Sequence, residues 1–195
     1  MDFDLVDELN GYLLDNKLEL AIEVAEKKLS DLPLTEFHKI IGRDLKPLSE
    51  NLTSYITDFY SQSKNKFEVK AIYSEMNGFT INYDLWFIDL FGYSELGTLD
   101  DLDWLSEFEY SSEKSMTITG FEDLQSVYEE YMENEKWRDK ELEKACKICE
   151  LLIILRLQEL FKEAKTIATQ RNLDWKDIPL FVTAHDYEMI YEVKK

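Results

Sequence analysis

Residues 67–87 read FEVKAIYSEMNGFTINYDLWF, in which apolar and more polar side chains alternate on both sides of a central Asn77-Gly78 pair. Alternation with a period of two is typical of strands, and Asn and Gly both tolerate the positive φ angles of a type I′ turn. The pattern therefore predicts a β-hairpin that turns at Asn77-Gly78. Because one face of such a hairpin is normally buried, these apolar side chains are expected to line a core: Tyr73, Phe79, Ile81 and Phe87.

The chain ahead of the hairpin has the three- to four-residue apolar spacing of helices. We expect a helix over residues 4–29, split at Gly11, and then a short helix with Thr35 as its N-cap. A third helix is expected over about residues 48–59.

The chain after the hairpin mixes strands with longer helices. The expected elements are a long connection with one helical turn (92–113), a strand (115–119), two helices (121–134 and 139–170) and two closing strands (180–183 and 188–193). The centre of the second helix, residues 148–157, is apolar nearly all round, which predicts that it is buried.

These elements predict an α+β fold. We expect N-terminal helices, an antiparallel sheet of about four or five strands around the central hairpin, and a long buried C-terminal helix. Residues 1–195 are expected to form a single domain, with a helical part at about 4–62 and the sheet with its helices at about 66–195.

The charge of the chain is strongly negative. Its 195 residues include 41 Asp and Glu but 22 Lys and Arg, for a net charge of −19. This excess repels the phosphates of nucleic acids and anionic membrane surfaces, so we expect neither as a partner. It favours a basic protein partner, although acidity that only aids solubility is the alternative. The charge does not predict an oligomeric state.

The start of the chain is acidic, where a secretory signal would be basic. The longest apolar run, Leu151 to Leu155, is too short to span a bilayer. A cytoplasmic location is therefore expected.

Residues 71–113 contain no Lys, Arg or His, but ten carboxylates and ten aromatic side chains. Aromatic side chains supply contact area at protein interfaces, and carboxylates pair with the Lys and Arg of a partner. The alternative is a solvated acidic face over aromatics that belong to the core. We predict a partner-binding surface formed by Trp86, Asp100, Asp101, Asp103, Trp104, Glu107 and Glu109.

Motifs for catalysis or cofactor binding are missing from the sequence, which has neither a G-x-S-x-G nucleophile motif nor a glycine loop for phosphate. Counted from Asp101, the positions that a calcium loop reserves for Gly and Glu hold Ser106 and Ser112. Cys146 and Cys149 form a C-x-x-C inside a helix, which favours two buried thiols over a redox or zinc site. We expect no catalytic residue, metal or cofactor.

A cluster of basic residues lies at the start of the long helix: Lys136, Arg138, Lys140, Lys144 and Lys147. Acidic residues are interspersed among them, and the spacing from Glu143 to Lys147 is that of an i,i+4 ion pair on an exposed face. The cluster therefore predicts no function.

In composition, a small acidic α+β chain without a catalytic motif resembles bacterial immunity proteins and antitoxins, which neutralise a basic toxin by covering its active surface. No residue motif carries this resemblance. It implies a non-catalytic, protein-binding inhibitor. One alternative is a carbohydrate-active hydrolase with a carboxylate pair, which requires an Asp or Glu of raised pKa in a cleft beside an exposed Trp. The other is a structural or adaptor domain with evenly dispersed carboxylates.

Overall fold

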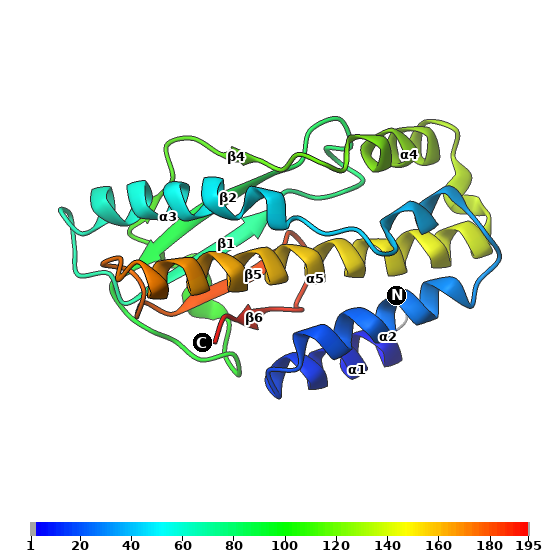
Figure 1. Ribbon diagram of the computed structural model, residues 1–195. Helices are drawn as coiled ribbons and strands as arrows, with labels where there is room; N and C mark the ends of the chain where they lie inside the picture. Colours follow the sequence, from blue (N-terminus) through cyan, green and yellow to red (C-terminus); the bar gives the residue numbers. More distant parts are fainter. Residues whose placement is uncertain (1–2, 195) are drawn as a thin grey trace.

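The computed structural model describes residues 3–194. Its α-helices are α1 (Phe3–Leu14), α2 (Leu18–Ser30), α3 (Ser49–Ser63), α4 (Glu122–Glu133) and α5 (Lys140–Gln170) (Figure 1). Its short 3-10 helices are η1 (Glu36–Ile40), η2 (Lys46–Leu48), η3 (Asp103–Ser106) and η4 (Lys136–Arg138). Its strands are β1 (Ala71–Met76), β2 (Phe87–Tyr93), β3 (Tyr110–Ser111), β4 (Met116–Thr117), β5 (Leu180–Ala184) and β6 (Tyr191–Glu192).

The strands form one sheet in the order β3-β2-β1-β5-β6, and β4 also pairs with β2. β1 and β2 are antiparallel, whereas β1 and β5 run parallel, with Ile72 opposite Leu180. The α+β fold is confirmed, but the expectation of a wholly antiparallel sheet is wrong at this one pairing. Parallel neighbours need a long crossover connection, and the chain from β1 to β5 passes through β2 and then through α4 and α5.

A hairpin of β1 and β2 is present, but it does not turn at Asn77-Gly78, and its second strand is Phe87–Tyr93 instead of the predicted run 79–87. Residues 77–86 form a longer connection, and Met76 lies opposite Ile88. The Asn77 side chain closes this connection, because its Nδ2 donates to the Leu85 carbonyl and its Oδ1 accepts from the Phe87 amide, both at 2.8 Å.

The reason for the longer connection is aromatic packing. Phe79 and Trp86 both enter the core, with ring centroids 5.6 Å apart and Tyr128 against both rings. Tyr73 and Phe79 are buried as predicted, but Ile81 is 69% exposed. A regular strand would place Phe79 and Ile81 on the same face, so the alternation over 79–87 does not reflect a strand.

The N-terminal helices follow the predicted order. The break between α1 and α2 falls at Asn16, which adopts the left-handed conformation with φ of 57°, and Gly11 lies inside α1. Asn tolerates that conformation, so the break falls there, and the predicted split at Gly11 is wrong. Thr35 is the N-cap of η1 as expected, and its amide donates to Nδ1 of His38 at 3.1 Å.

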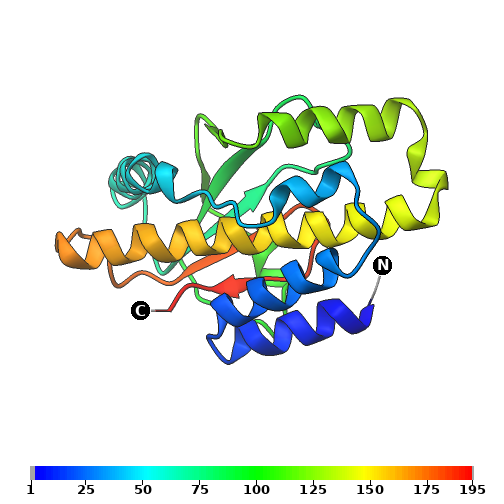
Figure 2. The same ribbon diagram turned by 45° about the vertical axis from the view of Figure 1, so that its right-hand side comes forward.

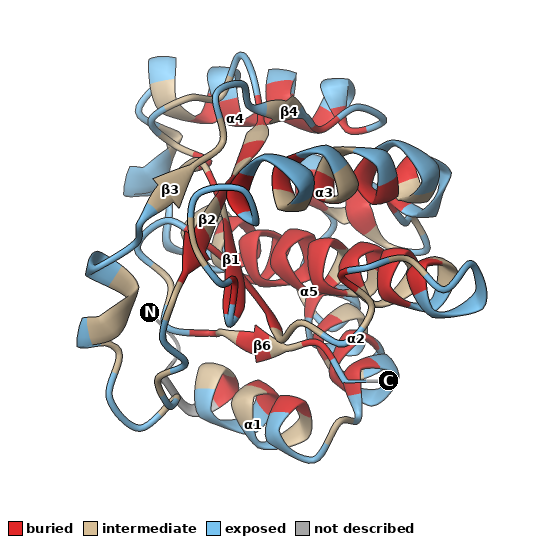
Figure 3. Ribbon diagram, turned by 90° about the vertical axis from the view of Figure 1, so that its left-hand side faces the viewer, coloured by how far each residue is buried: buried red, intermediate tan, exposed pale blue. Residues whose placement is uncertain are grey.

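The long helix α5 lies across one face of the sheet, between α3 and α2 (Figures 1 and 2). Its residues 148–157 are buried except for the half-buried Arg156, which confirms the predicted burial (Figure 3). The hydrophobic cluster around α5 extends from Leu5 in α1 to Val193 beyond β6. Most of the chain therefore contributes to this core.

Candidate functional site

The face of the sheet turned away from α5 is covered by residues 94–109, which we call the acidic loop. Trp104 anchors this loop, because its ring packs at 4.8 Å from Tyr93 and 5.4 Å from Phe181, centroid to centroid. Its indole Nε1 donates to the Thr98 carbonyl at 3.0 Å. A Cβ on Gly97 would lie 2.2 Å from the Trp104 ring, so the ring needs glycine at that position.

Hydrogen bonds fix the rest of the acidic loop. The Tyr93 hydroxyl donates to the Leu105 carbonyl at 3.0 Å. At the base of the loop, the Glu109 carboxylate accepts from the Ser94 amide at 2.8 Å and from the Ser94 hydroxyl. Asp101 accepts from the Asp103 amide at 3.1 Å and so orders the start of η3. The loop therefore has a defined conformation.

The predicted acidic residues lie on the outside of this loop. Asp100, Asp101, Asp103 and Glu107 are exposed, and none of them forms an ion pair with any side chain that the structure describes. Glu109 is also exposed, but its carboxylate is engaged by Ser94. Four exposed carboxylates without an ion pair in the described residues thus lie on one segment.

The two predicted tryptophans are not part of this surface. Trp86 is fully buried in the core, so its assignment as a partner-binding residue is wrong. Trp104 is half-buried and faces the sheet, where it holds the loop instead of meeting a partner. The aromatic side chain that the loop exposes is Phe108, which is 44% exposed and packs at 5.0 Å from Phe91.

Several basic side chains elsewhere in the chain pair with carboxylates outside the acidic loop. Arg156 pairs with Glu26 and Glu159 at 2.8 and 2.9 Å, and Arg171 pairs with Glu50 at 2.6 Å. Within residues 3–194, no Lys or Arg forms an ion pair with an acid of the 94–109 segment. The charge of the acidic loop is therefore left uncompensated by the described part of the molecule.

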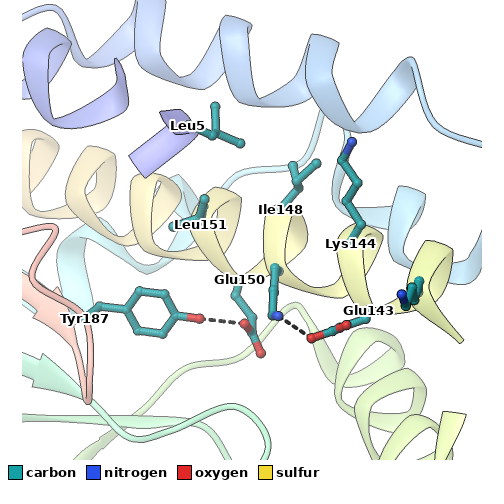
Figure 4. Close-up of a pocket in the computed structure, with 9 residues that line it drawn as sticks. Leu5, Glu143, Lys144, Ile148, Glu150, Leu151 and Tyr187 are labelled. Carbon is teal, nitrogen blue, oxygen red and sulfur yellow. Dashed lines mark hydrogen bonds and ion pairs between the residues drawn. The ribbon is translucent and has the colours of Figure 1, made fainter. Parts of the chain in front are cut away.

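A second candidate site lies along the first half of α5, and we call it the α5 cleft. It encloses about 270 Å³ between α5, Leu5 of α1 and Tyr187. Figure 4 shows Lys144, Ile148 and Leu151 along the side of α5 that faces Leu5, with Glu150 and Tyr187 on the adjoining side. The sequence analysis did not predict this site.

Glu150 is the unusual residue of the α5 cleft, because it is a carboxyl group only 7% exposed. The Tyr187 hydroxyl donates to it at 2.5 Å, and the Cys146 thiol donates to it at 3.7 Å. Burial raises the pKa of Glu150, an effect that the bonds from Tyr187 and Cys146 and the charge of Lys147 oppose in part. The pKa of this buried carboxyl group therefore lies above its usual value.

Glu143, one helical turn before Lys147, has the opposite environment. Its hydrogen bond and ion pair with Lys147 lower its pKa and keep it ionised. Exposed Trp137 lines a neighbouring hollow together with Glu143 and Glu150. Two carboxyl groups whose pKa values are shifted in opposite directions thus lie along the same side of α5.

The two cysteines are buried free thiols, as the sequence predicted. Burial raises the pKa of Cys149 to about 12 and raises that of Cys146 still further. Both thiols therefore stay protonated at neutral pH, which makes them poor nucleophiles and poor metal ligands.

The one sequence signal for the α5 cleft was the position of Glu150. It stands alone between Cys149 and Leu151 at the start of the most apolar part of the chain. A carboxylate is rarely buried in such a run without a specific partner. That partner, Tyr187, is 37 residues away in the sequence, so only the fold identifies it.

In the described part of the chain, no group of three or more potential metal ligands gathers. Nor does any helix within residues 3–194 combine the length and apolarity of a membrane span. No family model, curated protein or solved structure matches the sequence.

Proposed function

We propose that this chain is a non-catalytic protein-binding domain that covers a basic partner protein with its acidic loop. The observation that carries the proposal is the group of Asp100, Asp101, Asp103 and Glu107, exposed on an anchored segment without basic partners of their own. Complementary charge speeds the encounter of two proteins and disfavours wrong partners.

The anchoring of the loop adds to this argument. A loop that is already ordered loses less conformational entropy when it binds than a mobile one does. Trp104 and the Ser94–Glu109 bonds provide this order, and Phe108 adds exposed apolar area among the acids. The loop thus combines an aromatic contact with several carboxylates, as protein interfaces commonly do.

An inhibitor of the immunity or antitoxin type is the form of this function that we favour. Such an inhibitor needs a strongly acidic surface to cover the basic active surface of a toxin, and it needs no catalytic group. The net charge of −19 and the four exposed carboxylates of the loop, which form no ion pair with described residues, support this form of the proposal.

The test is capture of proteins on three baits from the native lysate at low and moderate salt. The baits are the wild type, a loop variant (D100N/D101N/D103N/E107Q), and a control variant (E23Q/E129Q/E133Q/E141Q) that removes the same charge from exposed positions elsewhere. We expect one basic protein on the wild type and the control, released by salt and missing from the loop variant. Equal retention by all three baits would contradict the proposal.

The captured protein also provides a functional test. Expressed alone in the host, it should slow growth, and co-expression of the wild-type chain should restore growth, whereas the loop variant should not. If the captured protein has no effect on growth, the chain is not an inhibitor of the immunity or antitoxin type. That outcome would not contradict the proposal that the acidic loop binds a basic protein.

The hydrolase alternative has one observation in its favour, since Glu150 has a raised pKa and lies near an exposed Trp137. The stronger observation is against it, because Glu143 is held by Lys147 and is a poor base or nucleophile. A panel of chromogenic glycosides tests it directly. Hydrolysis by the wild type that Glu150→Gln abolishes would favour this alternative over a purely binding role.

A further inference from the structure

We propose that the α5 cleft binds a small amphipathic molecule with one anionic head group, such as a medium-chain carboxylate, with its head at Lys140 and Lys144 and its apolar part on Leu5, Ile148 and Leu151. This inference is independent of the proposed function. It assigns a role to basic residues for which the sequence analysis predicted none.

The first argument for this proposal is the charge of the cleft. Lys147 pairs with Glu143. Lys140 and Lys144 are exposed, and neither forms an ion pair with any side chain of the described residues. The rim of the cleft therefore presents two lysines without an ion pair, in a chain whose net charge is −19.

The second argument is the shape and lining of the cleft. Its volume of about 270 Å³ is at the lower end for ligand pockets, so it suits a small molecule. Leu5, Ile148 and Leu151 give it an apolar wall, and the lysine stems reach from α5 to its rim (Figure 4). An apolar body and a single negative charge match these two features.

The polar end of the cleft limits the ligand further. Tyr187 already donates its hydroxyl proton to Glu150, so neither side chain needs a ligand for its own hydrogen bonding. A second negative charge on the ligand would lie near Glu143, which is ionised. The cleft consequently favours one anionic group at the rim over a dianionic or highly polar molecule.

The test is titration calorimetry of the full chain with octanoate as the probe and octanol as its neutral counterpart. Octanoate should bind saturably at one site and about tenfold more tightly than octanol. Octanol lacks the carboxylate, so it cannot form the two partly exposed ion contacts with the lysines. Octanoate binding no tighter than octanol binding, or no binding of octanoate at all, would overturn the proposal.

Two variants test whether octanoate binds at the α5 cleft. K140Q/K144Q should weaken octanoate binding by about tenfold and leave octanol binding unchanged. The control K114Q/K194Q removes the same charge from exposed lysines outside the cleft and should bind octanoate like the wild type, provided that circular dichroism shows equal folding. Equal octanoate affinity of both variants would also overturn the proposal, whatever the outcome of the capture on the acidic loop.

Discussion

The two faces of the sheet are covered in different ways. On one face, α5 contributes a continuous buried surface, from which the Gln158 side-chain amide donates to the Val182 and Met189 carbonyls at 3.2 and 2.9 Å. On the other face, the acidic loop is held by Trp104, and its outer carboxylates form no ion pair with any described side chain. The first face stabilises the fold, whereas the second leaves charge available for another molecule.

The largest effect is expected on the α5 face. Leu152 is fully buried in the core, so Leu152→Ala should lower the free energy of unfolding by about 2–5 kcal/mol through lost burial and the cavity left behind. Urea unfolding followed by circular dichroism measures it. A loss below about 1 kcal/mol would mean that α5 is less tightly packed than the structure indicates.

A smaller loss of stability is expected when the anchor of the acidic loop is removed. Trp104 is only half-buried, so Trp104→Ala should cost about 1–3 kcal/mol from its apolar contacts and its aromatic pairs. Because the loop then loses its fixed conformation, capture of the basic partner should also weaken.

Leu152→Ala serves as the control for that second effect. At a temperature where both variants are folded, it should leave partner capture unchanged, because Leu152 does not contact the loop face. If Trp104→Ala lowers stability but retains full capture, the order of the loop is not needed for binding.

The smallest effect concerns His185 and Glu75, which meet at the ends of β5 and β1, with the His185 Nδ1 and a Glu75 carboxylate oxygen 2.6 Å apart. The bond to Glu75 raises the pKa of His185 above its usual 6.5. A raised folded pKa stabilises the fold below the unfolded pKa, and this contribution is lost as pH rises through the folded pKa.

His185→Gln should therefore destabilise the protein by less than about 1 kcal/mol at about pH 6, since the histidine side chain is 55% exposed. The variant and the wild type should unfold at the same urea concentration at about pH 9. A difference that grows with pH would contradict the assigned direction of the pKa shift.

Local patterns in the sequence predicted most of the elements. The periodicity around residues 148–157 predicted a buried helix, and the alternation before Asn77 predicted a strand that overlaps β1. Both features depend on residues that are neighbours along one helix or one strand, so the sequence contains them directly.

The sequence also determined which residues carry the unpaired charge. No basic residue lies within 71–113, and Asp100, Asp101, Asp103 and Glu107 are exposed in the structure. Charged side chains without nearby opposite charges normally stay in water, so this part of the predicted site needed no knowledge of the fold.

Tertiary structure alone decided the places of the aromatic residues and the second site. Trp86 and Trp104 stand among the same acids, yet one packs against Phe79 in the core and the other against Phe181 on the opposite face. Likewise, the buried Glu150 depends on Tyr187, and the parallel pairing of β1 with β5 depends on α5 crossing the sheet. These contacts join residues far apart in the sequence, and local patterns do not specify which distant side chain fills a given space.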